Sequence, residues 1–151
     1  MPMERAYVTA MIDSLKSKIE ILKDIRKKNA EQLDLIKRVP FSAEDFDKNA
    51  DEKGILIYKL NKLDNGFQIV YDNLKAELEE NKAQYADEIR LMQSLITEIT
   101  ELSTTIQAEE ARNKAALENY FKGEHSKIKS GRSQSKAIKS YTQTMLNSGK
   151  R

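Results

Sequence analysis

The sequence predicts an all-α protein: long antiparallel helices in an elongated three- to four-helix bundle or coiled coil, with a short C-terminal helix that folds conditionally. Apolar residues recur every three or four positions over most of the chain, as on one helical face. Helix breakers are scarce, since proline occurs only at Pro2 and Pro40 and only two glycines precede position 123. Charged residues make up 33% of the chain against 39% hydrophobic, so apolar side chains suffice for stripes but not for a thick core.

The first helix is predicted from about residue 3 to 39. Its apolar stripe thins near Asn29, which makes that region less tightly specified. The helix should end where Pro40 disfavours the helical conformation of Val39. The stripe consists of Val8, Ile12, Leu15, Ile19, Leu22, Ile25, Leu33 and Ile36.

Several independent signals place the start of the second helix, predicted at 43–80, just after this proline. Ser42 offers an N-cap, and Asp45 stands three residues on, in the capping-box position normally held by Glu or Gln. Phe41 and Phe46 are spaced as the two members of a hydrophobic staple. The following acidic residues suit the positive end of the helix dipole and need no metal to explain them.

From Leu56 to Leu117 the apolar seam is close to an unbroken heptad repeat. A single helix of this length would leave its second half without a partner, unless two chains associate. We favour a fold-back near Asn81, in an apolar-poor stretch, because it gives three helices of similar length. The competing turn signal is the sequence Asp-Asn-Gly ending at Gly66, through which the apolar phase continues without a slip.

The third helix, predicted at 84–122, carries a second apolar stripe beside its main seam: Leu91, Leu95 and Leu102. Two stripes widen the buried face beyond that of a two-stranded coiled coil. These residues are therefore candidates for partner binding, although core packing is the more common explanation for any one of them.

The C-terminal tail, 123–151, differs in composition from the helical body, 1–122. Residues 1–40 carry a net charge of +3, residues 41–122 carry −7, and the tail carries +6. A Gly/Ser/Lys linker leads to an amphipathic segment at 133–147 that is too short to form a stable helix alone. This segment should fold on its own bundle or on a partner, through the apolar residues Ile138, Tyr141, Met145 and Leu146.

No residue pattern predicts catalysis, and we expect no catalytic residue, cofactor or metal. There is no cysteine, and the only histidine, His125, lies in the linker without a fixed partner. The basic tail follows an acidic body and no recognition-helix motif, which argues against nucleic-acid binding. Neither a signal-peptide core nor an apolar run of membrane-spanning length occurs in the sequence. We therefore expect a soluble, cytoplasmic protein that binds other proteins.

The chain resembles the FlgN-type flagellar export chaperones over most of its length. The resemblance rests on residues 15–23 (LKSKIEILK), 52–64 (EKGILIYKLNKLD), 96–102 (ITEITEL) and 112–114 (RNK). These are helical patterns rather than a signature motif.

Membership of this family implies a cytoplasmic chaperone that binds hook-filament junction (hook-associated) proteins and delivers them to the membrane-bound gate of flagellar type III export. Such chaperones grip an amphipathic C-terminal helix of the client, and their C-terminal segment takes part. Helix-in-groove recognition is the mechanism expected from the residues, with the tail either covering the groove or extending the grip. The alternative is a structural coiled-coil adaptor that dimerises through the seam. We favour a monomer, with a homodimer as the alternative.

Overall fold

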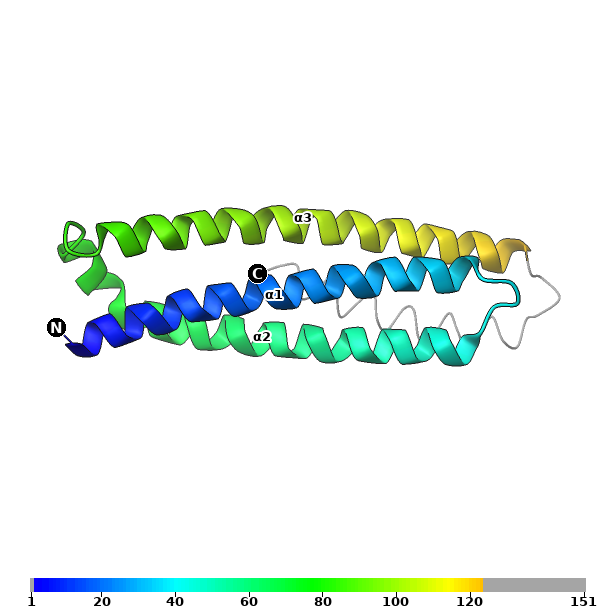
Figure 1. Cartoon of the computed structure of the whole chain (residues 1–151), viewed down its shortest axis with the longest axis horizontal. Helices are drawn as coiled ribbons and strands as arrows, with labels where there is room; N and C mark the ends of the chain where they lie inside the picture. The colour runs from blue at the N-terminus through cyan, green and yellow to red at the C-terminus, as the bar shows by residue number, and fades with distance from the viewer. Residues whose placement is uncertain (1, 124–151) are drawn as a thin grey trace.

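The computed structural model describes residues 2–123, which form three long antiparallel helices (Figure 1). They are α1 (Pro2–Lys37), α2 (Ala43–Glu80) and α3 (Ala86–Gly123), and the described residues contain no strand. The predicted all-α fold and the elongated bundle are confirmed. The predicted helix limits differ from those of the structure by two residues or fewer. The conditional C-terminal helix at 133–147 lies outside the described residues.

The connection between α1 and α2 is organised by the signals that the sequence shows around Pro40. The Ser42 hydroxyl accepts a hydrogen bond from the Asp45 backbone N–H at 3.2 Å, which caps α2. The Phe41 and Phe46 rings lie 5.9 Å apart as a staple. The Asp45 carboxylate, which a capping box would turn back on Ser42, instead accepts a hydrogen bond from Arg38 at 3.0 Å. A short aspartate thus completes only half of the box and ties the end of α1 to the start of α2.

The chain reverses at residues 81–85, at the fold-back that we favoured over Gly66. The Asn81 backbone N–H and its side-chain amide both donate to the Glu77 carbonyl, at 3.1 and 2.9 Å, and so satisfy one of the carbonyl groups in the last turn of α2. Tyr85 follows, only 2% exposed, and anchors the start of α3. Gly66 lies inside α2. Much of the predicted dimer seam is therefore buried within one chain.

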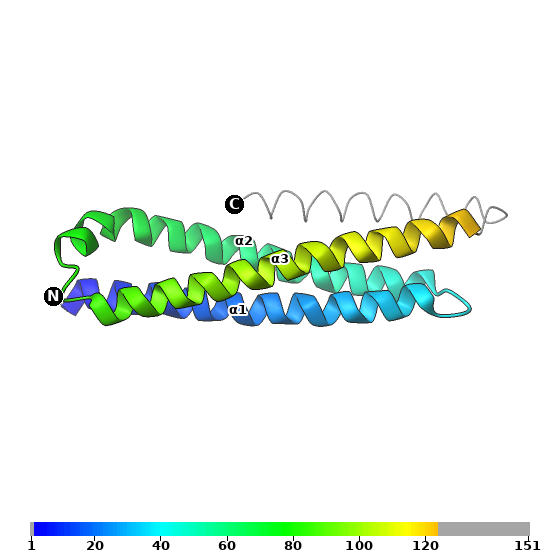
Figure 2. The ribbon, with the colours of Figure 1, turned by 90° about the horizontal axis from the view of Figure 1, so that it is seen from above.

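Helix α1 is the central element, because it packs along both α2 and α3 while those two helices hardly contact each other. Its apolar stripe is buried almost throughout, as the period of the sequence predicts. Figure 2 shows α2 rising away from α1 and α3 toward its C-terminal end. No helix among the described residues is long and apolar enough to cross a membrane. The buried apolar residues of α1 are Val8, Met11, Ile12, Leu15, Ile19, Leu22, Ile25, Leu35 and Ile36.

The seam of α2 is only partly buried in its middle. Leu60 and Leu74 are 8% and 6% exposed, but Leu63, Phe67 and Val70 between them are half-buried. In this stretch α2 meets α1 without closing on α3, so its apolar face is wider than the surface that α1 covers. The bundle is therefore open between α2 and α3.

Candidate functional site

The opening between α2 and α3 consists of two adjoining hollows. The larger has a volume of about 570 Å³ and reaches down to α1, where Leu15 and Lys18 contribute to its lining. Thr100 of α3 lines the same hollow. Its remaining lining residues are Ser14, Leu63, Asp64, Asn65, Phe67, Gln68, Ile96 and Ile99.

The smaller hollow, of about 250 Å³, continues the larger one toward the turn at residues 81–85. Phe67 of α2 and Ile96 of α3 line both hollows, so the two hollows adjoin at these residues. Five of the other lining residues of the smaller hollow are apolar: Met11, Tyr71, Leu78, Ile89 and Met92. The remaining four are Lys75, Glu79, Lys82 and Gln93. We call the two hollows together the α2/α3 groove.

The α2/α3 groove presents apolar surface that the bundle itself does not cover. Ile96 is 46% exposed and Tyr71 is 37% exposed, although both belong to the groove wall. The groove runs along α2 from Leu63 to Glu79, about 24 Å at the helical rise of 1.5 Å per residue. This length matches four turns of an added helix.

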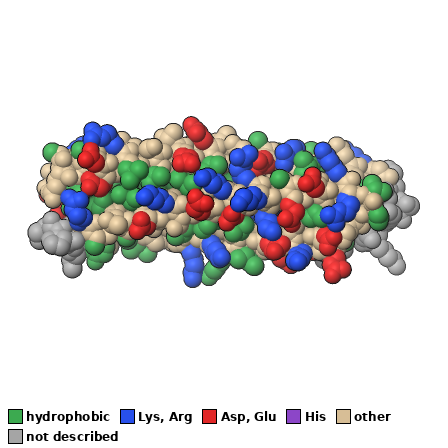
Figure 3. Space-filling model, in the orientation of Figure 1, with side chains coloured by type: hydrophobic (Ala, Val, Ile, Leu, Met, Phe, Trp, Pro, Cys, Tyr) green, Lys and Arg blue, Asp and Glu red, His purple; other side chains and the backbone are tan. Residues whose placement is uncertain are grey.

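Charges at the groove are few and of both signs. In the larger hollow, Lys18 and Asp64 form an ion pair at 2.7 Å. Lys75, Glu79 and Lys82 stand at the opposite end. Figure 3 shows the face of the bundle on which α1 lies toward the viewer, and there too Lys/Arg and Asp/Glu side chains are interspersed with hydrophobic ones. An occupant of the groove would therefore be held by apolar contact, with charges acting at its ends.

The candidate partner-binding residues predicted on α3 differ in their exposure in the structure. Leu91 is 40% exposed and lies outside the lining of the two hollows. Leu95 and Leu102 are half-buried and pack against the hydrophobic core. The four tail candidates, Ile138, Tyr141, Met145 and Leu146, lie outside the described residues.

The groove residues were visible in the sequence only as parts of the seam. Phe67, Met92 and Ile96 all belong to the repeat from which the core was predicted. Periodicity shows that a face is apolar, but it does not show which part of that face a neighbouring helix covers. Tyr71, one position beyond the seam residue Val70, was not predicted.

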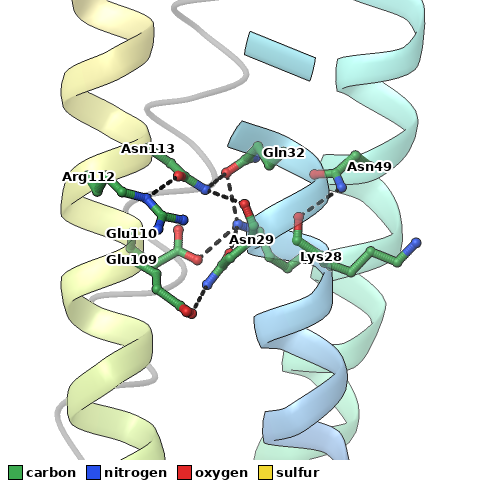
Figure 4. Close-up of polar contacts among 9 residues, drawn as sticks. Lys28, Asn29, Gln32, Asn49, Glu109, Glu110, Arg112 and Asn113 are labelled. Atoms are coloured by element: carbon green, nitrogen blue, oxygen red, sulfur yellow. Dashed lines mark hydrogen bonds and ion pairs between the residues drawn. The ribbon is translucent and has the colours of Figure 1, made fainter. Parts of the chain in front are cut away.

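Sequence reasoning also missed a buried polar layer around Lys53 of α2, in which all three helices take part. Figure 4 labels its members Asn29, Gln32, Glu110 and Asn113. The Lys53 side chain is 0% exposed. Its Nζ donates to Asn29 Oδ1 at 2.6 Å, to Gln32 Oε1 at 3.1 Å and to Glu110 Oε1 at 2.9 Å. The ammonium therefore binds oxygen atoms from α1 and α3 at once.

Amide side chains extend this layer. Asn113 of α3 donates from Nδ2 to the Asn29 carbonyl at 2.9 Å and to Gln32 Oε1 at 3.0 Å. Asn29 in turn donates to Glu109 at 3.2 Å. These hydrogen bonds are made in the present axial alignment of α1 against α2 and α3, and an axial shift of one helix would break them.

Burial lowers the pKa of Lys53 from 10.5 to about 8, and the nearby Glu110 carboxylate opposes this shift. The side chain is enclosed and lines neither hollow of the groove. Within the described part of the chain, no group of three or more His, Cys, Asp or Glu residues could hold a metal ion. The geometry therefore gives the polar layer a structural role and leaves the groove as the candidate binding site.

The fold and the groove define a class: an extended three-helix bundle with an uncovered apolar groove between its outer helices. A scan against protein-family models finds no match for this sequence, and searches of curated proteins and of solved structures find none either.

Proposed function

We propose that this chain is a non-catalytic binding protein whose α2/α3 groove receives an amphipathic helix of a partner protein. The observation that carries the proposal is the α2/α3 groove, whose two hollows adjoin at the apolar residues Phe67 and Ile96, between two helices that hardly contact each other. Such a groove fits helix-in-groove recognition, in which apolar side chains spaced three or four residues apart on the partner helix enter the groove.

The helical walls of the groove favour a helix over an extended peptide as its occupant. Its walls are helices, so it exposes side chains and no sheet edge to which a strand could add. A helix laid between α2 and α3 would complete a four-helix arrangement and cover Ile96 and Tyr71.

In its specific form the proposal is a cytoplasmic flagellar export chaperone. Its clients are hook-associated proteins, which it delivers to a component of the type III export gate. The proposal is supported by the resemblance to FlgN-type chaperones, the three-helix body and the groove, which suits the client's amphipathic C-terminal helix. No nucleic acid and no membrane insertion enter into this function.

Replacing Ile96 with glutamate should lower the affinity for such a helix at least tenfold, because a charge would enter the centre of the groove. The probe is a synthetic peptide of the C-terminal helix of a hook-filament junction protein, and the measurement is calorimetric titration. Ile69→Glu is the matched control, since Ile69 is 63% exposed on α2 and lies outside the groove lining. Equal loss of affinity in the two variants would place the binding surface elsewhere.

The chaperone assignment is tested in a flagellated source. The tagged chain should retain hook-associated proteins in a pull-down, and deletion of its gene should reduce their secretion. Recovery of no hook-associated protein together with normal secretion would refute the assignment. Sedimentation at micromolar concentration should show a compact monomer, whereas an extended obligate dimer would favour the structural adaptor.

A further inference from the structure

We infer that the chain carries its own occupant for the α2/α3 groove: residues 138–146 dock there as a fourth helix and cover the site until a partner helix displaces them. The displacement rests on the proposed function, but the docking does not. The apolar face of this segment, Ile138, Tyr141, Met145 and Leu146, spans nine residues, or about 13 Å of helix. The groove, at about 24 Å, is long enough to hold it.

The length of the tail allows this placement. Helix α3 ends at Gly123, and Thr100 at the nearer end of the groove precedes it by 23 residues, or about 35 Å. Residues 124–137 span at most about 46 Å when extended. Ile138 can therefore lie level with Thr100, and the rest of the segment then runs on past Ile96.

The same arithmetic requires an extended linker. If the chain reversed at Gly123 and a helix ran back along the bundle from there, Ile138 would lie level with Ala108, about 12 Å short of Thr100. The linker composition opposes that helix, because it contains Gly131 and serines at 126, 130, 133 and 135.

Charge also favours an intramolecular occupant. The tail after Gly123 carries seven Lys/Arg and one Glu, whereas α2 carries ten Asp/Glu against five Lys, and α3 carries seven against four Lys/Arg. The two helices as wholes therefore attract the tail over a range of about 10 Å in moderate salt. The charged residues that line the groove are Lys18, Lys75 and Lys82 against Asp64 and Glu79, so apolar contact rather than charge holds the segment within it. Tethering adds an effective concentration in the millimolar range, which lets a segment too short to fold alone dock with weak contacts.

Disulfide trapping on the full chain tests the docking, because the sequence contains no cysteine to interfere. One variant joins Gln68→Cys, at the groove, to Thr142→Cys, which flanks the apolar face of the tail. The matched control joins Lys16→Cys, an exposed position on α1 outside the groove lining, to the same Thr142→Cys.

The groove pair should form an intramolecular disulfide at least tenfold faster than the control pair. Adding Ile138→Asp and Met145→Asp should abolish this preference without changing the helical signal of the bundle. Equal rates for the two pairs would overturn the inference. Products that are mainly disulfide-linked dimers would also overturn it, by showing that a second copy occupies the groove.

Displacement is tested separately, with the hook-filament junction peptide. The full chain carrying Ile138→Asp and Met145→Asp should bind the peptide about tenfold more tightly than the unmodified chain, because its groove is uncovered. Equal affinity would overturn the competition between tail and partner. Absence of binding to both chains would refute the proposed function, while the disulfide rates would still decide whether the tail docks.

Discussion

Raising the pH from 8 to above 10 is expected to stabilise the fold by up to about 3 kcal/mol through Lys53 alone. Below pH 8 this side chain is protonated in both the folded and the unfolded states, so its contribution is constant. Between about pH 8 and 10.5 the unfolded chain holds a proton that the folded chain has released, and stability therefore rises with pH. Each unit of pKa difference corresponds to about 1.4 kcal/mol.

Urea unfolding at pH 7, 8, 9 and 10, followed by circular dichroism, measures this rise. The informative quantity is the difference in pH dependence between the unmodified chain and Lys53→Met, because this difference isolates the contribution of Lys53. The methionine variant should lack the Lys53 contribution, whereas Lys59→Met, at an exposed position on α2, should retain it. Identical pH slopes for the unmodified chain and Lys53→Met would show that Lys53 is not held in the way described.

Replacing Glu110 with leucine is expected to lower the free energy of unfolding at pH 7 by about 3 kcal/mol. Glu110 supplies the carboxylate 2.9 Å from Lys53 Nζ, and its loss leaves a buried ammonium without that ion pair. The pKa of Lys53 should fall further, since the Glu110 carboxylate now opposes the shift caused by burial. The same unfolding measurement at neutral pH gives the loss.

Adding Lys53→Met to this variant should recover part of the loss, because an apolar pair of similar volume replaces the ion pair. The recovery is partial because Asn29 Oδ1 loses the hydrogen bond from Lys53. Glu118→Leu is the control for removing one acidic side chain from α3, and at its exposed position it should change stability by less than about 0.5 kcal/mol. A Glu110→Leu variant as stable as this control would show that the ion pair contributes little. A double variant whose loss of stability equals the sum of the losses in Glu110→Leu and in Lys53→Met would show that the two residues act independently.

The polar layer had a signal in the sequence that a search for apolar stripes ignores. On α1, Asn29 and Gln32 continue the three-to-four spacing from Ile25 to Ile36. On α2, Lys53 lies four positions before Ile57, which is 1% exposed. Polar residues that take core positions in the helical repeat of neighbouring helices indicate a buried polar layer. Only the structure shows that these residues lie at the same height along the bundle and hydrogen-bond to one another.

The sequence by itself determined the helical segments and the connection at Pro40, and it favoured the fold-back near Asn81 over a turn at Gly66 or a continuous helix in a dimer, because these features depend on neighbouring residues. Period, capping at Ser42 and the scarcity of apolar residues near Asn81 all act within a few positions. Only the tertiary structure decided which apolar face stays open. Helix α1 cannot cover the whole width of the faces of α2 and α3, and the uncovered remainder around Phe67 and Ile96 forms the groove. The burial of a residue depends on residues that are far away in the sequence, so local periodicity predicts the apolar face of a helix but not what covers it.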